Sequence, residues 1–256
     1  MNEFKLINKY LKPLSLKNPG ALNLSDDIYF DAKKGTAISV DTYVENVHFI
    51  DSSDPNNFLK RILRASLSDL YCKGIKPESY FLSFALKREL VTSSWLKKIK
   101  DILNNEQKKF DITLAGGDTT TSSKLVITVI VIGYSKKKPV FRNNCSVNED
   151  IYITGNIGDS FLGLCILKKK INLGKFNNFF KKRYYEPDLQ IKISPYLKSI
   201  ASASIDVSDG LAQDLRQLCI NSKCGALIDL NLLPLSSICR KLVKKKKIKL
   251  KNIFSK

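Results

Sequence analysis

The chain has 256 residues, of which 43 % are hydrophobic, so it can bury one large or two ordinary domain cores and is not intrinsically disordered. No apolar run approaches the roughly 20 residues that a membrane helix needs, and the charged N-terminus lacks a signal-peptide core, so we expect a soluble cytoplasmic protein without a membrane partner. The formal net charge of +19 fits nucleic-acid binding, anionic ligands or a lysine-biased genome with solvated surface cations.

The first half of the chain alternates β-branched or aromatic runs with helical patterns. The clearest helix is expected to begin at Asp54 as its N-cap, with Pro55 in the first helical position, and to end before Gly74. A second helix is expected from about Thr92 to Phe110. The predicted strands are 36–40, 80–86, 112–115 and 124–134.

The polar stretch 142–150 interrupts this alternation, which then restarts, and we place a domain boundary there. Strands are expected at 151–155, 204–207 and 226–230. Helices are expected at 159–170, near 176–200 and at 211–220. The pattern predicts an α/β (α+β) protein with mixed sheets flanked by helices.

The six cysteines form no C-x-x-C pair, and the chain has a single histidine. This composition favours buried free thiols over a zinc site or a disulfide framework.

Seven aspartates stand at the ends of apolar elements, which is unexpected in so basic a chain. Asp69 shares a helical face with Phe58, Ile62 and Ala65, so it should be buried. A buried carboxylate is costly unless it is paired or binds a metal, and a salt-bridged or capping aspartate is the alternative interpretation. The seven are Asp26, Asp27, Asp41, Asp69, Asp118, Asp206 and Asp209.

Three of these aspartates also have simple structural interpretations when each is considered alone. Asp206 and Asp209 precede a predicted helix in "DVSDG", where Ser208 and Asp209 are typical capping residues. Asp118 is typical of a turn, although the preceding glycines of "LAGGDTT" also permit close approach to a ligand. Considered together, the aspartates favour several magnesium ions, which prefer oxygen ligands and can clamp a triphosphate.

Six short segments, each weak alone, stand in one order between about residues 25 and 235, and the ordered set is specific. They are "SDD", "SVDTYVENVHF", "LSDLYCKGIKPESYFLSFAL", "LAGGDTT", "IYITGNIGDSFLGL" and "SIDVSDGLAQDL".

With these segments the chain resembles the thiamine-monophosphate kinases, whose superfamily also contains aminoimidazole ribonucleotide synthetase and selenophosphate synthetase. The resemblance implies the two-domain fold of that superfamily and a homodimer joined through N-terminal strands. It implies that 1–142 binds ATP and magnesium and dimerises, and that 143–256 is a C-terminal domain truncated relative to the family. The implied reaction moves the γ-phosphoryl group of ATP to thiamine monophosphate, giving thiamine diphosphate and ADP, with no enzyme nucleophile or base.

The resemblance also implies the site residues. His48 matches a residue that contacts thiamine phosphate, although a lone histidine is more often a structural hydrogen-bonder. Arg142 matches a nucleotide contact; a surface cation is the alternative, but its planar fork suits phosphate. The implied ATP-binding residues are Gly117, Asp118, Arg142 and Ser208. The implied magnesium ligands are Asp27, Ser39, Asp41, Asp69, Asp118, Asp206 and Asp209, together with Val40 through backbone or water.

The sequence departs from the family pattern in three places. Asn23, Leu24 and Ser25 replace a Gly-x-Gly before the paired aspartates, and Val40 stands where many members have threonine. A block of the form GGEDYEL, whose glutamate contacts thiamine, and a later aromatic are not found before the lysine-rich tail. The alternatives are therefore another phosphotransferase of the superfamily, a truncated and impaired member, or a basic nucleic-acid-binding protein, which would leave the aspartates unexplained.

Overall fold

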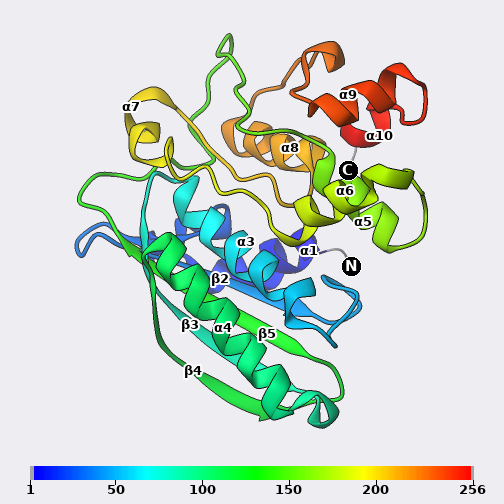
Figure 1. Cartoon of the computed structure of the whole chain (residues 1–256). Coiled ribbons are helices and arrows are strands. Elements are labelled where there is room, and N and C mark those ends of the chain that lie inside the picture. Colours follow the sequence, from blue (N-terminus) through cyan, green and yellow to red (C-terminus); the bar gives the residue numbers. More distant parts are fainter. Residues whose placement is uncertain (1–2, 255–256) are drawn as a thin grey trace.

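The structure, a computed structural model, describes residues 3–254 and contains one five-stranded mixed sheet in the order β1-β2-β5-β3-β4. Helices α3 and α4 cover one face of this sheet, and the second half of the chain packs beyond α3 (Figure 1). This arrangement confirms the predicted α/β class. The strands are β1 (Tyr29–Asp31), β2 (Thr36–Val44), β3 (Pro77–Leu86), β4 (Thr113–Thr121) and β5 (Val126–Tyr134).

The strand pairing follows the order of the sheet. β1 pairs antiparallel with β2, β2 with β5, and β5 with β3, whereas β4 runs parallel to β3 at the sheet edge. The four predicted strands of the first half are confirmed, although their bounds differ from the expected ones by several residues. β1 was not predicted, because three residues are too few for a pattern of period two.

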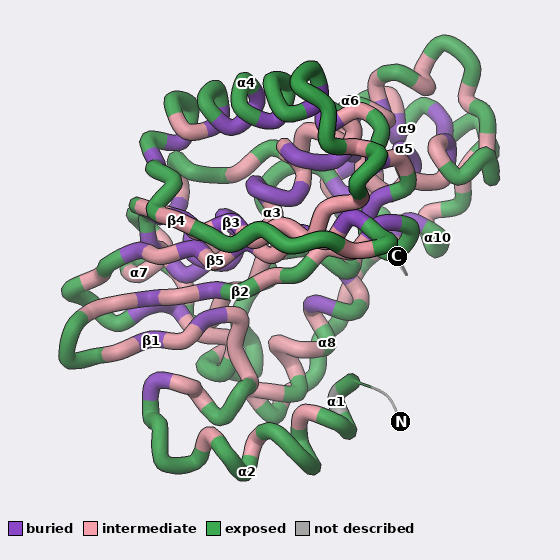
Figure 2. The backbone as a smooth tube through the Cα atoms, turned by 90° about the horizontal axis from the view of Figure 1, so that it is seen from below, coloured by how far each residue is buried: buried purple, intermediate pink, exposed green. Residues whose placement is uncertain are grey.

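The two predicted helices of the first half are confirmed. Asp54 caps a short 3₁₀ turn, η3 (Pro55–Asn57), by accepting a hydrogen bond from the N–H of Asn56, and α3 (Leu59–Tyr71) follows. α4 (Ser93–Phe110) begins after Thr92, whose hydroxyl accepts the N–H of Trp95 at 3.2 Å. Only one side of α4 is buried (Figure 2), as its amphipathic sequence requires.

The N-terminal segment contains α1 (Glu3–Leu6), a π-helical turn at Ile7–Leu11, α2 (Lys12–Ser15) and a kinked 3₁₀ segment at Pro19–Leu24. Leu22, Asn23 and Leu24 all have positive φ in this kink. This is the unusual path that replaces the glycine-rich turn before the paired aspartates.

The second half of the described chain contains helices but no strand, so the strands expected at 151–155, 204–207 and 226–230 are wrong. A strand needs a hydrogen-bonded neighbour, and these segments run beside none. Tyr152 and Leu227 remain 88 % and 96 % exposed, respectively. The helices are α5 (Asp159–Leu167), α6 (Asn177–Tyr185), α7 (Leu197–Ile200), α8 (Leu211–Ser222), α9 (Ser237–Lys244) and α10 (Leu250–Phe254).

The buried apolar side chains form two clusters. One joins the sheet to α3 and α4 and is drawn from residues 28–131. The other joins α5, α6, α8, α9 and α10 and is drawn from residues 157–253. The cores therefore lie on either side of the predicted boundary at 142/143, which remains a prediction.

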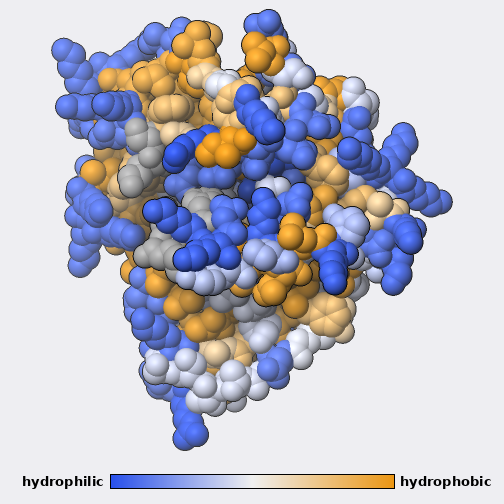
Figure 3. Space-filling model, turned by 180° about the vertical axis from the view of Figure 1, so that it is seen from behind, coloured by the Kyte–Doolittle hydropathy of each residue, from blue (hydrophilic) through white to orange (hydrophobic). Residues whose placement is uncertain are grey.

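Hydrophilic side chains project around the rim of the face seen in Figure 3, with apolar surface between them. Among the described residues, no helix combines the length and apolar character needed to cross a membrane. All six cysteines are free thiols, but only Cys239 is buried, so the expectation that all would be buried is wrong.

Gly117 allows β4 to approach β3, because a Cβ at this position would collide with the carbonyl group of Leu82. Replacing Gly117 with alanine is expected to lower the free energy of unfolding by about 2 kcal/mol, since a backbone carbonyl cannot rotate away from the added methyl. Urea denaturation measures this change. Gly225→Ala is the control, because its Cβ would meet nothing within 4 Å. Equal losses at both glycines would contradict the prediction.

Candidate active site

A large open hollow of about 2640 Å³ lies between the sheet with α3 and the second half of the chain. Small-molecule pockets commonly measure about 300–1,000 Å³, so this hollow has room for more than one ligand. Most of the predicted site residues line it. These are Asp27, Val40, Asp41, His48, Asp69, Arg142, Asp206, Ser208 and Asp209.

Asp69, on the last turns of α3, is only 8 % exposed, which confirms the burial predicted from its helical face. Burial raises the pKa of Asp69 well above its ordinary value, and repulsion from Asp206 and Asp41 adds to the rise. A hydrogen bond from Ser39 lowers the pKa of Asp69 and so opposes part of this rise. The alternative of a salt-bridged or capping aspartate does not apply, because Asp69 makes no ion pair among the described residues and lies far from the helix start.

Asp41 lies on β2, on the sheet face that α3 covers. Tyr43 donates a hydrogen bond to its Oδ2 at 3.0 Å, and the Tyr43 hydroxyl also lies 3.2 Å from Oγ of Ser66 on α3. Burial raises the pKa of Asp41 and the charge of Asp206 adds to the rise, while hydrogen bonds from Ser66 and Tyr43 lower it. Asp41 on β2 and Asp69 on α3 are thus both close enough to Asp206 for its charge to raise their pKa values.

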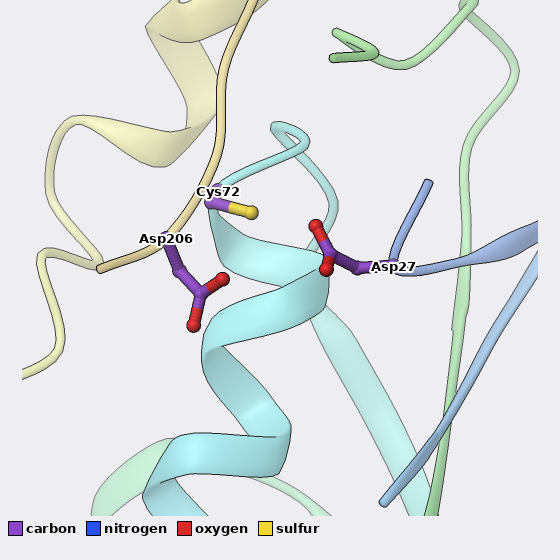
Figure 4. Close-up of side chains that lie close together, drawn as sticks. All are labelled: Asp27, Cys72 and Asp206. Carbon is purple, nitrogen blue, oxygen red and sulfur yellow. The ribbon is translucent and has the colours of Figure 1, made fainter. Parts of the chain in front are cut away.

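Asp206 reaches the same region from the extended segment before α8. The Ser68 hydroxyl lies 2.6 Å from its Oδ2, which anchors this segment to α3. Figure 4 shows the side chains of Asp206, Asp27 and Cys72 directed toward a common space at the C-terminal end of α3. One ligand atom of each lies within 4.8 Å of the others.

Asp26 and Asp27 meet two cations of the chain. Lys73 Nζ lies 3.0 Å from Oδ1 of Asp26 and 3.2 Å from Oδ2 of Asp27. The Arg142 Nη2 contacts Oδ1 of Asp27, and the N–H of Arg142 donates to Oδ2 of Asp26 at 2.8 Å. Burial lowers the pKa of Arg142, and its Nε is buried without a hydrogen-bond partner among the described atoms. Lys73 was missed at the sequence level, because a lysine beside a helix C-terminus is usually solvated.

The loop before α8 is organised by Asp214, which was also missed. Its Oδ2 accepts hydrogen bonds from the N–H groups of Ser208, Asp209 and Gly210, at 3.0, 3.2 and 3.1 Å. Burial raises the pKa of Asp214 to about 6, with Asp206 and Asp209 adding to the rise. The N-cap of α8 is Gly210, and no side chain of the described residues caps the helix, so the capping interpretation of Ser208 and Asp209 is wrong. Both side chains are left at the hollow.

His48 is exposed at the end of the hollow near β2. Its Nδ1 accepts the N–H of Val44 at 2.9 Å, so the neutral ring carries its proton on Nε2. Tyr184 donates a hydrogen bond to the backbone oxygen of His48 at 3.1 Å, and the imidazole ring of His48 packs edge-on to Tyr43. His48 therefore makes the structural hydrogen bond expected of a lone histidine. Its Nε2–H has no partner among the described residues and can donate to a ligand.

Gly117 and Asp118 lie outside this hollow, on β4. Asp118 pairs in register with Ser83 on β3. Ser83 pairs in turn with Thr128 on β5, and Thr128 pairs with Thr42 on β2. The Thr42 and Thr128 hydroxyls lie 2.9 Å apart on the face opposite Asp41, and three strand spacings of roughly 4.8 Å separate Thr42 from Asp118. A single chain therefore does not bring Asp118 to the other acids. Its assigned roles remain predictions.

Ser39 and Val40 are adjacent on β2 and face opposite sides of the sheet. Ser39 is buried beneath α3 with its hydroxyl 3.5 Å from the oxygen of Ser66, whereas Val40 is 60 % exposed. Of these two residues, Ser39 is the one that offers a side-chain oxygen to Asp69.

The donor set of the hollow is hard. Several carboxylates and hydroxyl groups line it, with the thiol of Cys72 near Asp27 and Asp206, and such oxygen-rich sets fit magnesium. Burial and repulsion from Asp206 raise the pKa values of Asp41 and Asp69, and neither carboxylate forms an ion pair among the described residues. A divalent ion would supply the missing positive charge.

Residues 21–135 match the family model described as AIR synthase related protein, N-terminal domain. A thiamine-monophosphate kinase of Buchnera aphidicola subsp. Schizaphis graminum is 37 % identical over 244 residues, covering 93 % of this chain and 75 % of the relative. The thiamine-monophosphate kinase of Escherichia coli K12 is 34 % identical over 241 residues, covering 91 % and 73 %. The chain thus spans about three quarters of the length of these relatives.

Solved structures show the same fold. The structure of AaThiL complexed with AMPPCP and TMP aligns with a TM-score of 0.86 at 24 % identity, over 98 % of this chain and 81 % of that one. A chain of a HypE–HypF complex aligns with a TM-score of 0.72 at 16 % identity, over 97 % and 80 %. These likenesses confirm the aminoimidazole ribonucleotide synthetase-like fold. Sequence identity above 30 % to curated relatives, over at least 91 % of its length, shows that this chain belongs to the thiamine-monophosphate kinase family.

Proposed function

We propose that this chain is a magnesium-dependent kinase that transfers the γ-phosphoryl group of ATP to the phosphate of thiamine monophosphate. The terminal P–O bond of ATP breaks, a phosphate oxygen of thiamine monophosphate bonds to the phosphorus, and ADP leaves with the electron pair. The single observation that carries the proposal is the convergence of Asp41, Asp69 and Asp206 from three elements on one hollow. The family membership supports the choice of substrates.

Asp41, Asp69 and Asp206 are the first ligands that we assign to magnesium. Asp27, Ser39, Val40 through its backbone, Asp118 and Asp209 are the further candidates that the family pattern implies. Bound magnesium would neutralise the charge of the phosphates and of the transferring group. Without cations, this cluster of buried and half-buried carboxylates would repel a polyphosphate, so the acidity of the hollow is itself an argument for metal.

The chain's own residues would position the reactants. The guanidinium of Arg142, with its buried unpartnered Nε, can turn from Asp27 to a nucleotide phosphate, and the Ser208 hydroxyl borders the same space. His48 presents Nε2–H to the acceptor side. The acceptor phosphate is already anionic, so positioning and charge neutralisation suffice without a general base.

We further propose that the active form is a homodimer in which residues 1–142 supply the contact. Support comes from the sheet face opposite α3 and α4, where Val40 and Tyr134 are 60 % and 52 % exposed, and from the open edge of β4. Exposed apolar strand faces of this kind are typical of interfaces. Gly117 and Asp118 would then act on ATP within the assembled dimer.

The test is formation of thiamine diphosphate, measured by chromatography alongside coupled detection of ADP. Both products are expected only when ATP, thiamine monophosphate and magnesium are all present, and chelation should abolish both. Asp101→Asn, an exposed change on α4, is the control and should leave the rate unchanged. A folded chain that binds ATP but never forms thiamine diphosphate would refute the kinase activity.

An acceptor panel separates the proposal from another phosphotransferase of the superfamily. Thiamine monophosphate should be phosphorylated, whereas unphosphorylated thiamine and a simple phosphate monoester should not. ADP formation that responds equally to any phosphate monoester would favour the alternative.

A further inference from the structure

Two residues beyond the end of α3, a lysine is buried beneath the hollow, against two of the acids that line it. Lys73 is 0 % exposed, although lysine is rarely buried. Its Nζ lies 3.0 Å from Oδ1 of Asp26 and 3.2 Å from Oδ2 of Asp27, and it donates to the backbone oxygen of Ser204 at 2.9 Å. The ammonium group therefore makes one hydrogen bond, to the backbone oxygen of Ser204, and two ion pairs, to Asp26 and Asp27. Lys73 is therefore a fixed internal charge.

The chain itself engages all four oxygens of Asp26 and Asp27. Oδ1 of Asp26 meets Lys73 and the N–H of Asp27, and Oδ2 accepts the N–H of Arg142. Oδ1 of Asp27 contacts the Arg142 guanidinium. Oδ2 of Asp27 accepts no hydrogen bond among the described residues and meets only the charge of Lys73. Two carboxylates are thus matched by two cations of the chain.

The other acids of the hollow differ in this respect. The salt bridges of the described residues leave Asp41, Asp69 and Asp206 without a cationic partner within 4.0 Å. They are held by hydroxyl groups, such as Tyr43 on Asp41 and Ser68 on Asp206. Hydroxyl groups orient a carboxylate but do not cancel its charge.

We propose that Lys73 takes the place of one divalent ion: it neutralises Asp26 and Asp27, and the divalent ions of this chain bind on the Asp41, Asp69 and Asp206 side of the hollow. The inference rests on the proposed function only in requiring that the hollow bind metal. The position of Lys73 limits the number of divalent ions that the hollow can bind, because Lys73 and a metal ion would compete for Oδ2 of Asp27.

Loss of the lysine charge would free a defined space for an ion. Oδ2 of Asp27 would lose the one charge that it meets among the described residues, in a carboxylate that lies close to Asp206 and to Cys72. One ligand atom from each of these three residues already lies within 4.8 Å of the others (Figure 4). Manganese, which accepts such an oxygen-rich set and is counted directly by electron paramagnetic resonance, is a suitable probe.

The test is a manganese titration of the metal-stripped full chain, without nucleotide or thiamine monophosphate. Lys73→Met keeps the length of the side chain and removes its charge, and it is expected to bind one more Mn²⁺ per chain than the wild type. Lys76→Met is the matched control three residues away, because the one ion pair of Lys76 within residues 3–254 is with exposed Asp111. It should bind the wild-type number of ions.

A charge-balanced variant covers the case in which Lys73→Met fails to fold without metal. Lys73→Met combined with Asp26→Asn removes one charge of each sign and leaves Oδ2 of Asp27 without a cation, while Oδ1 keeps its contact with Arg142, and this variant should also gain an ion. A wild-type chain that binds Mn²⁺ while neither folded variant gains an ion would overturn the role of Lys73 and leave the proposed function standing. If no variant and no wild-type chain binds Mn²⁺, both proposals fail.

Discussion

Asp69→Asn is expected to make the metal-free chain more stable and the enzyme inactive. The substitution keeps the shape of a side chain that is 8 % exposed and removes a charge that Asp206 and Asp41 repel. Removing an uncompensated buried charge should raise the free energy of unfolding by about 1–3 kcal/mol near neutral pH. Thiamine diphosphate formation should fall by more than roughly 100-fold, since even partners of metal ligands are worth 10–100-fold.

The stability gain should depend on pH with a defined sign. The pKa of Asp69 is raised in the folded state, so folding favours its protonated form. Its stabilising contribution is complete below the ordinary aspartate pKa of about 3.9 and is lost as pH rises through the raised value. Asparagine does not titrate. The advantage of Asp69→Asn over the wild type should therefore be smallest near pH 4 and grow toward neutral pH.

Urea denaturation in a chelating buffer at several pH values measures this difference. Asp51→Asn is an opposite control, because hydrogen bonds from Ser53 and Asn57 lower the pKa of Asp51 against the effect of burial. Its replacement should destabilise the chain toward neutral pH. If Asp69→Asn were less stable than the wild type at pH 7 without metal, the carboxylate would not be under repulsion, and the case for a metal site would weaken.

Much of the first half of the fold could be predicted because its signals are local. The cap at Asp54 and the helical period predict that Asp69 lies on a buried helix face, and its low exposure on α3 confirms this. The position of Asp118 could not be obtained in this way. Its side chain faces away from Asp41 because of the strand register and a bulge between Tyr80 and Phe81, neither of which a period-two pattern specifies.

The second half shows where local signals fail. The apolar runs 151–155 and 226–230 have strand-like composition, but strands are stabilised by their neighbours and the described chain provides none. Lys73 and Asp214 were missed for a related reason. Lys73 is buried only because residues 26, 27 and 204 converge on it, and Asp214 binds backbone N–H groups four to six residues before it. Both roles depend on contacts that cannot be predicted from the spacing of residues in the sequence.

Arg64→Met is expected to lower the free energy of unfolding by about 3–5 kcal/mol, because it leaves Glu106 buried and unpaired. Arg64 on α3 binds Glu106 on α4 through two hydrogen bonds of 2.7 and 2.8 Å, and the two side chains are only 5 % and 4 % exposed. Arg64 also donates to the backbone oxygen of Pro187 at 3.0 Å, which ties the second half of the chain to α3. Urea denaturation measures the loss.

A double-mutant cycle separates the stability contributed by the Arg64–Glu106 ion pair from the cost of leaving Glu106 buried without a partner. Arg64→Met with Glu106→Leu replaces both partners with apolar groups and should recover most of the stability, leaving the loss of the Pro187 contact as the remainder. The exposed pair Lys76 and Asp111 is the matched control, and breaking it with Lys76→Met should change the stability far less than breaking the buried pair. A double variant as unstable as Arg64→Met alone would mean that Arg64 acts mainly through Pro187. In that case the Pro187 contact would be a main tie between α3 and the second half of the chain, beside the bond from Ser68 to Asp206.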